Sequence, residues 1–154
     1  MRKTAIVMGA MVLMAGALRI VSAHEGMEDL PAGPIRDRHE LMEGIGKNAK
    51  IIGDALKAGN TEGVEGAAGK IQTSAAKIAA LFPKGSTDPK SRAKPAIWTN
   101  WKKFEETAKL LEARAGEVED ATRNGGDVKA ASTKMFGACK TCHEDFRKPE
   151  KKKK

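Results

Sequence analysis

Two cysteines and a histidine lie close together near the C-terminal end of the chain. Cys139, Cys142 and His143 fall within "GACKTCHEDFRK", and the 154 residues contain no other cysteine. On a helix, positions three and four residues apart share a face, so one helix would present both thiols and the imidazole to the same side. The thiols can then add to the two vinyl groups along one porphyrin edge, and the imidazole can reach the iron. The C-x-x-C-H pattern therefore predicts one covalently attached haem c.

Three other uses of the thiols are open at this point. A C-x-x-C redox pair usually follows a strand of an α/β unit, and no segment here alternates with the period of a strand. A zinc site would need a fourth ligand, which His24 or His39 could supply. A plain disulfide would use both cysteines and give His143 no role. Haem attachment is favoured because it uses all three residues of the motif.

Four amphipathic segments must position this motif. Their apolar residues recur every three or four positions, which is typical of one buried face of a helix. The segments cover residues 35–56, 61–82, 97–118 and 128–146. A stretch rich in proline and glycine joins the second segment to the third. The predicted fold is therefore all-α, an antiparallel four-helix bundle with a long crossover loop between helices 2 and 3.

The N-terminus reads as an export signal. Arg2 and Lys3 precede an apolar run at residues 5–18, and "VSA" at residues 21–23 places small residues at −3 and −1 of a cleavage site. We therefore expect a signal peptide at residues 1–23 and an exported four-helix-bundle domain with a basic C-terminal tail at residues 24–154. A membrane anchor is the alternative, but the run is short for a span. No membrane span is expected after processing.

The charge of the chain points to proteins rather than nucleic acids as partners. The formal net charge is +8, but five basic residues lie in the C-terminal tail "KPEKKKK". The remaining surface is nearly balanced, which argues against nucleic-acid binding. The tail could steer the protein toward a redox partner with an acidic docking face, or it could simply be a solvated run of like charges.

The chain resembles the class II c-type cytochromes, the cytochrome c prime family. "CKTCHEDFRK" is similar to the family's C-terminal ending, "KPAIWTNWKKFEE" to the start of its third helix, and "RHELMEGIGKNAKIIGDALKAG" to its first helix. The resemblance covers nearly the whole chain after the signal peptide. It implies a periplasmic haem protein, often a homodimer, with the haem held by Cys139 and Cys142 and with His143 as the fifth iron ligand.

The resemblance also implies roles for residues around the haem. Phe146 and Arg147 would lie beside the proximal imidazole, and Arg38 would lie near a haem propionate. Each also has a simpler interpretation, with Phe146 as core and the two arginines as solvated charges. Trp98 and Trp101 are interpreted as core residues that could also pack on the porphyrin.

The sixth iron position separates the two leading functions. Met42 occupies the distal position of the family, where a methionine makes a low-spin, six-coordinate electron carrier and an apolar non-ligand leaves the iron open for nitric oxide or carbon monoxide. Met42 could instead be core filler. Met135 is expected on the proximal side and Met27 in the N-terminal lead, and His39 is expected to turn away from the Met42 face. A helical adaptor without haem is a third class. No catalytic constellation is visible, so we do not expect an enzyme.

Overall fold

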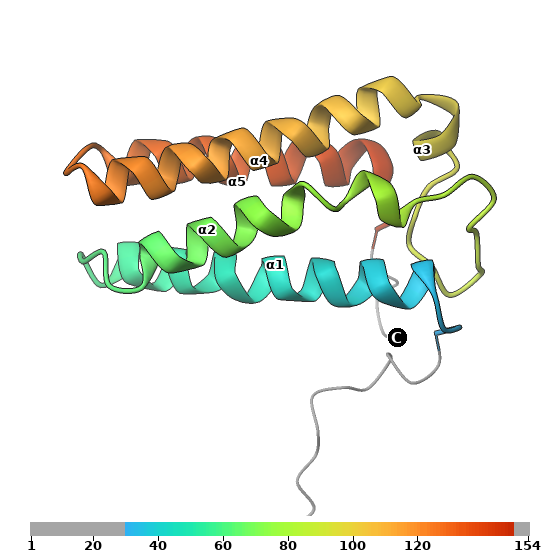
Figure 1. Cartoon of the computed structure of the whole chain (residues 1–154), viewed down its shortest axis with the longest axis horizontal. Coiled ribbons are helices and arrows are strands. Elements are labelled where there is room, and N and C mark those ends of the chain that lie inside the picture. Colours follow the sequence, from blue (N-terminus) through green and yellow to red (C-terminus); the bar gives the residue numbers. More distant parts are fainter. Residues whose placement is uncertain (1–29, 150–154) are drawn as a thin grey trace, which may run out of the picture.

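The computed structural model describes residues 30–149, and its regular elements are helices. Five are α-helices: α1 (Pro34–Lys57), α2 (Val64–Ala75), α3 (Ala96–Thr99), α4 (Trp101–Arg123) and α5 (Val128–Phe146). A short 3-10 helix, η1, covers Ala79–Leu81. The four long helices α1, α2, α4 and α5 run alternately in opposite directions (Figure 1). The predicted antiparallel four-helix bundle is therefore confirmed.

Residues 1–29 and 150–154 lie outside the described part of the chain. The signal peptide, Met27 and most of the lysine tail fall there and remain predictions. Within residues 30–149, extended backbone pairs only at one isolated bridge, between Ala93 and Arg147. None of the helices in these residues has the length and apolarity that crossing a membrane requires.

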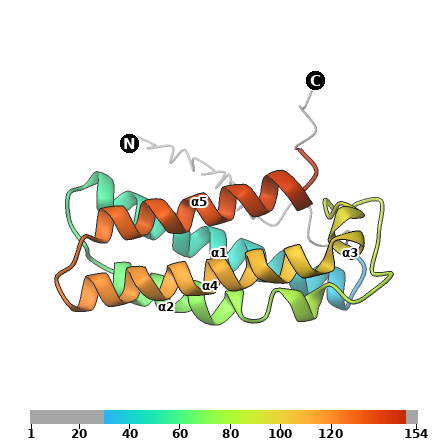
Figure 2. The same cartoon turned by 90° about the horizontal axis from the view of Figure 1, so that it is seen from above.

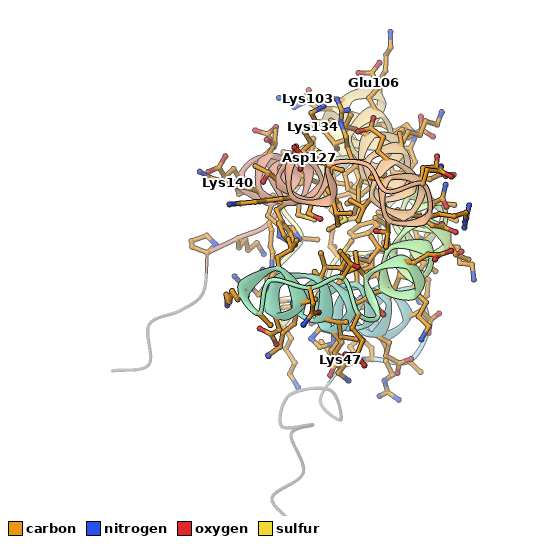
Figure 3. The ribbon with its side chains drawn as sticks, turned by 90° about the vertical axis from the view of Figure 1, so that its left-hand side faces the viewer. Lys47, Lys103, Glu106, Asp127, Lys134 and Lys140 are labelled. Atoms are coloured by element: carbon orange, nitrogen blue, oxygen red, sulfur yellow. The ribbon has the colours of Figure 1, made fainter. Side chains whose placement is uncertain are left out.

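Each long helix buries one apolar stripe, as the sequence periodicity predicts. Helix α4 packs closely on both α2 and α5, and α1 packs on α2, whereas α1 and α5 barely touch each other. The end-on view in Figure 3 shows the four helices in cross-section, with Lys140 pointing outward from α5. At the start of α5, the carboxylate of Asp127 accepts a hydrogen bond from the Ala130 amide at 2.9 Å and caps the helix.

The third predicted helix is divided in two. Asn100 has φ −120° and ψ 46°, outside the helical region, and it separates α3 from α4. The short α3 is tied to the end of the second segment by Trp98, whose indole Nε1 donates to the Phe82 carbonyl at 3.1 Å and to the Pro83 carbonyl at 3.0 Å. The prediction of one continuous helix was wrong here, because the hydrogen bonds of Trp98 to the end of the second segment outweigh local helix propensity.

The second predicted helix also ends earlier than its apolar stripe. Regular α-helix stops at Ala75, and the chain continues through a turn into η1. Ile78 and Phe82 nevertheless stay buried, at 2% and 6% exposure. The stripe therefore predicted burial correctly even where it did not predict the helix type.

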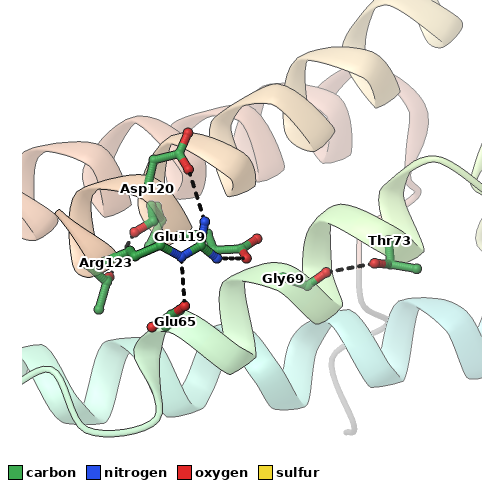
Figure 4. Close-up of polar contacts among 8 residues, drawn as sticks. Glu65, Gly69, Thr73, Glu119, Asp120 and Arg123 are labelled. Atoms are coloured by element: carbon green, nitrogen blue, oxygen red, sulfur yellow. Dashed lines mark hydrogen bonds and ion pairs between the residues drawn. The ribbon is translucent and has the colours of Figure 1, made fainter.

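An ion-pair cluster joins α2 to α4 at the end of the bundle away from the cysteines. Figure 4 shows Arg123 between Glu65 of α2 and Glu119 of its own helix, and the Arg123 Nε lies 3.0 Å from Glu65 Oε1. Hydrogen bonds to Glu119 and Glu65 raise the pKa of Arg123 above its ordinary value. Arg123 is exposed to solvent, so water and salt screen these pairs and they add little to stability.

Candidate functional site

A cavity of about 720 Å³ opens between α1 and α5, at the end of the bundle where the crossover loop lies. Figures 1 and 2 show that the start of α1, the end of α5 and the crossover meet at this end. The volume falls in the range of ligand pockets, about 300–1,000 Å³. Side chains from these three segments and from α3 and α4 line it, among them Ile35, Met42, Phe82, Ala93, Ile97, Phe104, Cys142, His143 and Phe146.

The two thiols lie one helical turn apart on α5. Cys142 lines the cavity, Cys139 precedes it by one helical turn, and both pack partly buried against the core as free thiols. Thr107 Oγ1 on α4 donates to Cys142 Sγ at 3.7 Å. Burial raises the pKa of both thiols above the usual range, with the neighbouring Cys142 adding to the effect at Cys139.

His143 adds a nitrogen ligand at the same cavity. Although His143 is among the exposed residues, partial desolvation lowers its pKa, and the positive charges of Arg147 and Arg92 lower it further. The imidazole is therefore neutral at neutral pH, which is the form that binds a metal. Arg147 lines the same cavity but is exposed to solvent, so its role beside the imidazole of a bound haem stays a prediction.

These residues fit a haem c better than the other groups that the sequence left open. Among residues 30–149, no three histidine, cysteine or acidic side chains converge to hold a metal ion, so His39 does not complete a zinc site. The C-x-x-C motif lies within α5 and does not follow a strand. Two free thiols on one helix face, a neutral imidazole and a large apolar cavity match the donor set and the space that a covalently attached porphyrin needs.

Met42 faces the cavity from α1. Met42 is partly buried in the cavity wall. Gly46 lines the same wall one helical turn later and contributes no side chain there. Met135 is fully buried in the core at 0% exposure and does not line the cavity. The structure therefore brings Met42, Cys142 and His143 to one cavity and leaves Met135 outside it.

His39 lies on the cavity wall as well, so the expectation that it turns away from Met42 was wrong. The two residues are three positions apart on α1, and residues at that spacing share a helix face. His39 is therefore a second nitrogen donor at the same wall, and tests of the sixth ligand must include it.

Arg38 is not the solvated charge that the simpler interpretation describes. It is 4% exposed, lines the cavity, and donates hydrogen bonds to Ser86 and Ser91 of the crossover loop. Phe146 is buried in the core, as its simpler interpretation says, and it also lines the cavity, which is compatible with a place beside the haem. Trp98 is partly buried outside the cavity lining.

Sequence analysis missed the contribution of the aromatic cluster and the crossover loop. The Phe104 ring packs on Phe82 and Phe146, with ring centroids 4.9 Å and 5.3 Å apart, and all three line the cavity. Their positions on apolar stripes could have indicated this wall. Ser91 and Ala93 line the cavity from the crossover loop, and no local pattern marks them.

Comparison with known proteins identifies the family of the chain. The family model described as Cytochrome C' matches residues 33–147. Cytochrome c-556 of Rhodopseudomonas palustris is 30% identical over 97% of this chain and 99% of its own length, and a cytochrome c' of the same species is 30% identical over 73% and 80%. A solved structure of cytochrome c' from R. palustris superposes with a TM-score of 0.71 at 28% identity, covering 79% of this chain and all of the other. The chain therefore belongs to the cytochrome c' family of c-type haem proteins.

Proposed function

We propose that this protein is a one-electron carrier in which Cys139 and Cys142 would hold a haem c, and His143 and Met42 would bind its iron. When bound, the haem supplies an iron that accepts and returns one electron. The observation that carries the proposal is that Met42 of α1 and His143 of α5 line the same cavity from two different helices.

The residues of the chain suit this role. A methionine thioether is a soft ligand that favours ferrous iron and raises the reduction potential. Phe82, Phe104 and Phe146 give the cavity an apolar wall against which a porphyrin can pack. His143 is available as a neutral imidazole because partial desolvation and nearby positive charge lower its pKa. We infer no substrate chemistry and propose that the protein is not an enzyme.

Gas binding is the second candidate. If Met42 only fills the wall, the distal side of the cavity stays open to a small ligand. A variant of cytochrome c prime from Alcaligenes xylosoxidans that shares this fold was solved as a nitric oxide complex, at 19% identity and a TM-score of 0.68. That likeness concerns the fold, so the choice between the two functions depends on Met42.

An absorption spectrum of the oxidised and reduced holoprotein tests the proposal. We expect a low-spin, six-coordinate spectrum, with a weak far-red sulfur-to-iron band in the oxidised form, and slow uptake of carbon monoxide by the reduced form. A high-spin spectrum with free uptake of carbon monoxide would contradict methionine ligation and favour the gas-binding function.

We also propose that the domain works in the periplasm, after removal of residues 1–23. The export-type N-terminus and the covalent attachment of haem through both thiols support this location. Homodimer formation is proposed from the family alone. Sedimentation of the holoprotein measures it directly.

The redox partner is proposed to carry an acidic docking face. A second hollow of about 470 Å³ lies beside His143, and its lining is mostly cationic: Arg92, Lys94, Lys140, Arg147 and Lys148, with Glu144 as the one acidic residue. We call these five cationic residues the basic rim. Opposite charge on a partner would raise the rate of encounter at this edge, and salt would weaken the effect.

Reversing one charge of the basic rim should change electron-transfer rates according to the charge of the reagent. We expect Lys140→Glu to slow oxidation of the reduced protein by anionic hexacyanoferrate(III) several-fold at low salt, and to speed oxidation by cationic tris(1,10-phenanthroline)cobalt(III). Both effects should fade at high salt, because the interactions are screened beyond about 10 Å at 0.1 M. Stopped-flow kinetics measure the rates. Lys129→Glu, in the first turn of α5, is the matched control. Equal effects of both variants would contradict the proposal that partners dock at the basic rim.

A further inference from the structure

The two helices that carry the proposed axial ligands have little direct contact with each other. Helix α1 packs on α2, and α5 packs on α4, while α1 and α5 meet across the cavity. Met42 and His143 must nevertheless keep a fixed separation if both are to bind one iron. Their spacing is therefore set indirectly, through α2 and α4 and through any other segment that contacts both helices at this end of the bundle.

The crossover loop is anchored to α1 through Arg38. One guanidinium nitrogen, Nη1, donates to Ser86 Oγ at 2.8 Å, and the other, Nη2, donates to the Ser86 carbonyl at 2.9 Å and to Ser91 Oγ at 3.0 Å. The guanidinium also lies 4.7 Å from the centroid of the Phe82 ring. Charged donors make the stronger class of hydrogen bonds, and this group is almost fully buried.

The other end of the crossover loop is anchored to the end of α5 through backbone hydrogen bonds. The Lys94 amide donates to the Phe146 carbonyl at 2.9 Å, and the Lys148 amide donates to the Arg92 carbonyl at 2.7 Å. Between them lies the antiparallel bridge of Ala93 with Arg147. These contacts begin three residues after His143, so they fix the helix end that presents the imidazole.

We propose that residues 83–95 form a strap across the mouth of the cavity, and that Arg38 is the positioning residue that locks it to α1. The strap sets the spacing between α1 and α5, and thereby holds Met42 and His143 at the separation that one iron requires. This inference rests on the proposed function, because it assumes that both residues are ligands. It assigns Arg38 to the strap rather than to a haem propionate, since at least three of its five N–H donors are used there.

Two variants break the same anchor from opposite sides in the holoprotein. Arg38→Met removes the guanidinium, and Ser86→Ala combined with Ser91→Ala removes its side-chain acceptors and leaves Arg38 in place. Because the serine variant removes no buried charge, it keeps the test valid if Arg38→Met does not fold. Lys50→Met, which removes an exposed charge from the same helix, is the matched control.

Hydrogen exchange and spectroscopy measure the outcome. We expect both variants to speed exchange at the Lys94 and Lys148 amides about tenfold or more, to weaken the far-red sulfur-to-iron band, and to speed carbon monoxide uptake, with Lys50→Met unchanged. Arg38→Lys should recover only part of the protection, because an ammonium cannot bridge the two serines as a planar guanidinium does. Rescue of both the exchange protection and the band by lysine would contradict this geometry.

Two results would overturn the strap. Unchanged exchange at Lys94 and Lys148 in both variants would show that Arg38 does not hold the loop. Changes in Arg38→Met alone, with the serine variant like wild type, would assign Arg38 to a propionate instead. Failure of the proposed function appears separately, as a high-spin wild-type spectrum, and in that case the exchange comparison still decides whether the strap exists.

Discussion

Replacing both Cys139 and Cys142 by serine is expected to abolish covalent haem attachment completely. A serine hydroxyl is close to a thiol in size but does not form the thioether bond, so any haem that enters the cavity will be removed by acid-acetone extraction. The variant should also lose stability, because a group that binds only the native state stabilises it. A loss of about 3 kcal/mol would lower the thermal midpoint by roughly 10 °C in a domain of this size.

Extraction followed by absorption of the protein fraction measures attachment, and circular dichroism follows unfolding. Each single serine variant should keep one thioether and retain part of its colour after extraction. Thr141→Ser, an exposed position between the two cysteines, is the matched control and should behave like wild type. Extraction-resistant haem in the double variant, or a colourless wild type, would contradict haem attachment through this motif.

The sequence predicts the bundle well because helix periodicity is a local property. The first segment was predicted at residues 35–56 and is α1, Pro34–Lys57, and the last was predicted at residues 128–146 and is α5, Val128–Phe146. The deviations at Asn100 and after Ala75 occur where the chain approaches the crossover loop. Contacts with that loop join residues far apart in sequence, and periodicity contains no information about them.

In the candidate site, too, residues placed by local helical spacing could be predicted, and residues placed by long-range contacts could not. Cys142 and His143 were predicted from spacing within one helix, and the structure places both at the cavity. The same helical spacing places His39 on the face of Met42, so the prediction that it turns away was a wrong reading of a local pattern. The burial of Arg38 depends on partners 48 and 53 residues away, Ser86 and Ser91, so an arginine next to a histidine gave no sign of it.

Replacing Met42 by alanine is expected to convert a low-spin, six-coordinate protein into a high-spin form that binds carbon monoxide readily. Alanine removes the thioether and leaves space on the distal wall, where Gly46 adds no side chain that could take its place. The reduction potential should fall, because loss of a soft ligand removes stabilisation of ferrous iron. Absorption spectra of both oxidation states, carbon monoxide kinetics and a redox titration measure the three effects.

Two controls decide whether Met42 itself is responsible. Met135→Leu changes a methionine in the closed core, so it should leave the spectrum unchanged, because volume-conserving core substitutions are well tolerated. His39→Ala removes the nitrogen donor that shares the cavity wall with Met42. If His39→Ala produces the high-spin form and Met42→Ala does not, the sixth ligand of the wild type is the His39 imidazole. The wild type is then six-coordinate, but its reduction potential is lower than a thioether ligand would give. If neither substitution changes the spectrum and the wild type already takes up carbon monoxide freely, the distal wall has no ligand. Met42 is then part of an apolar gas-binding pocket.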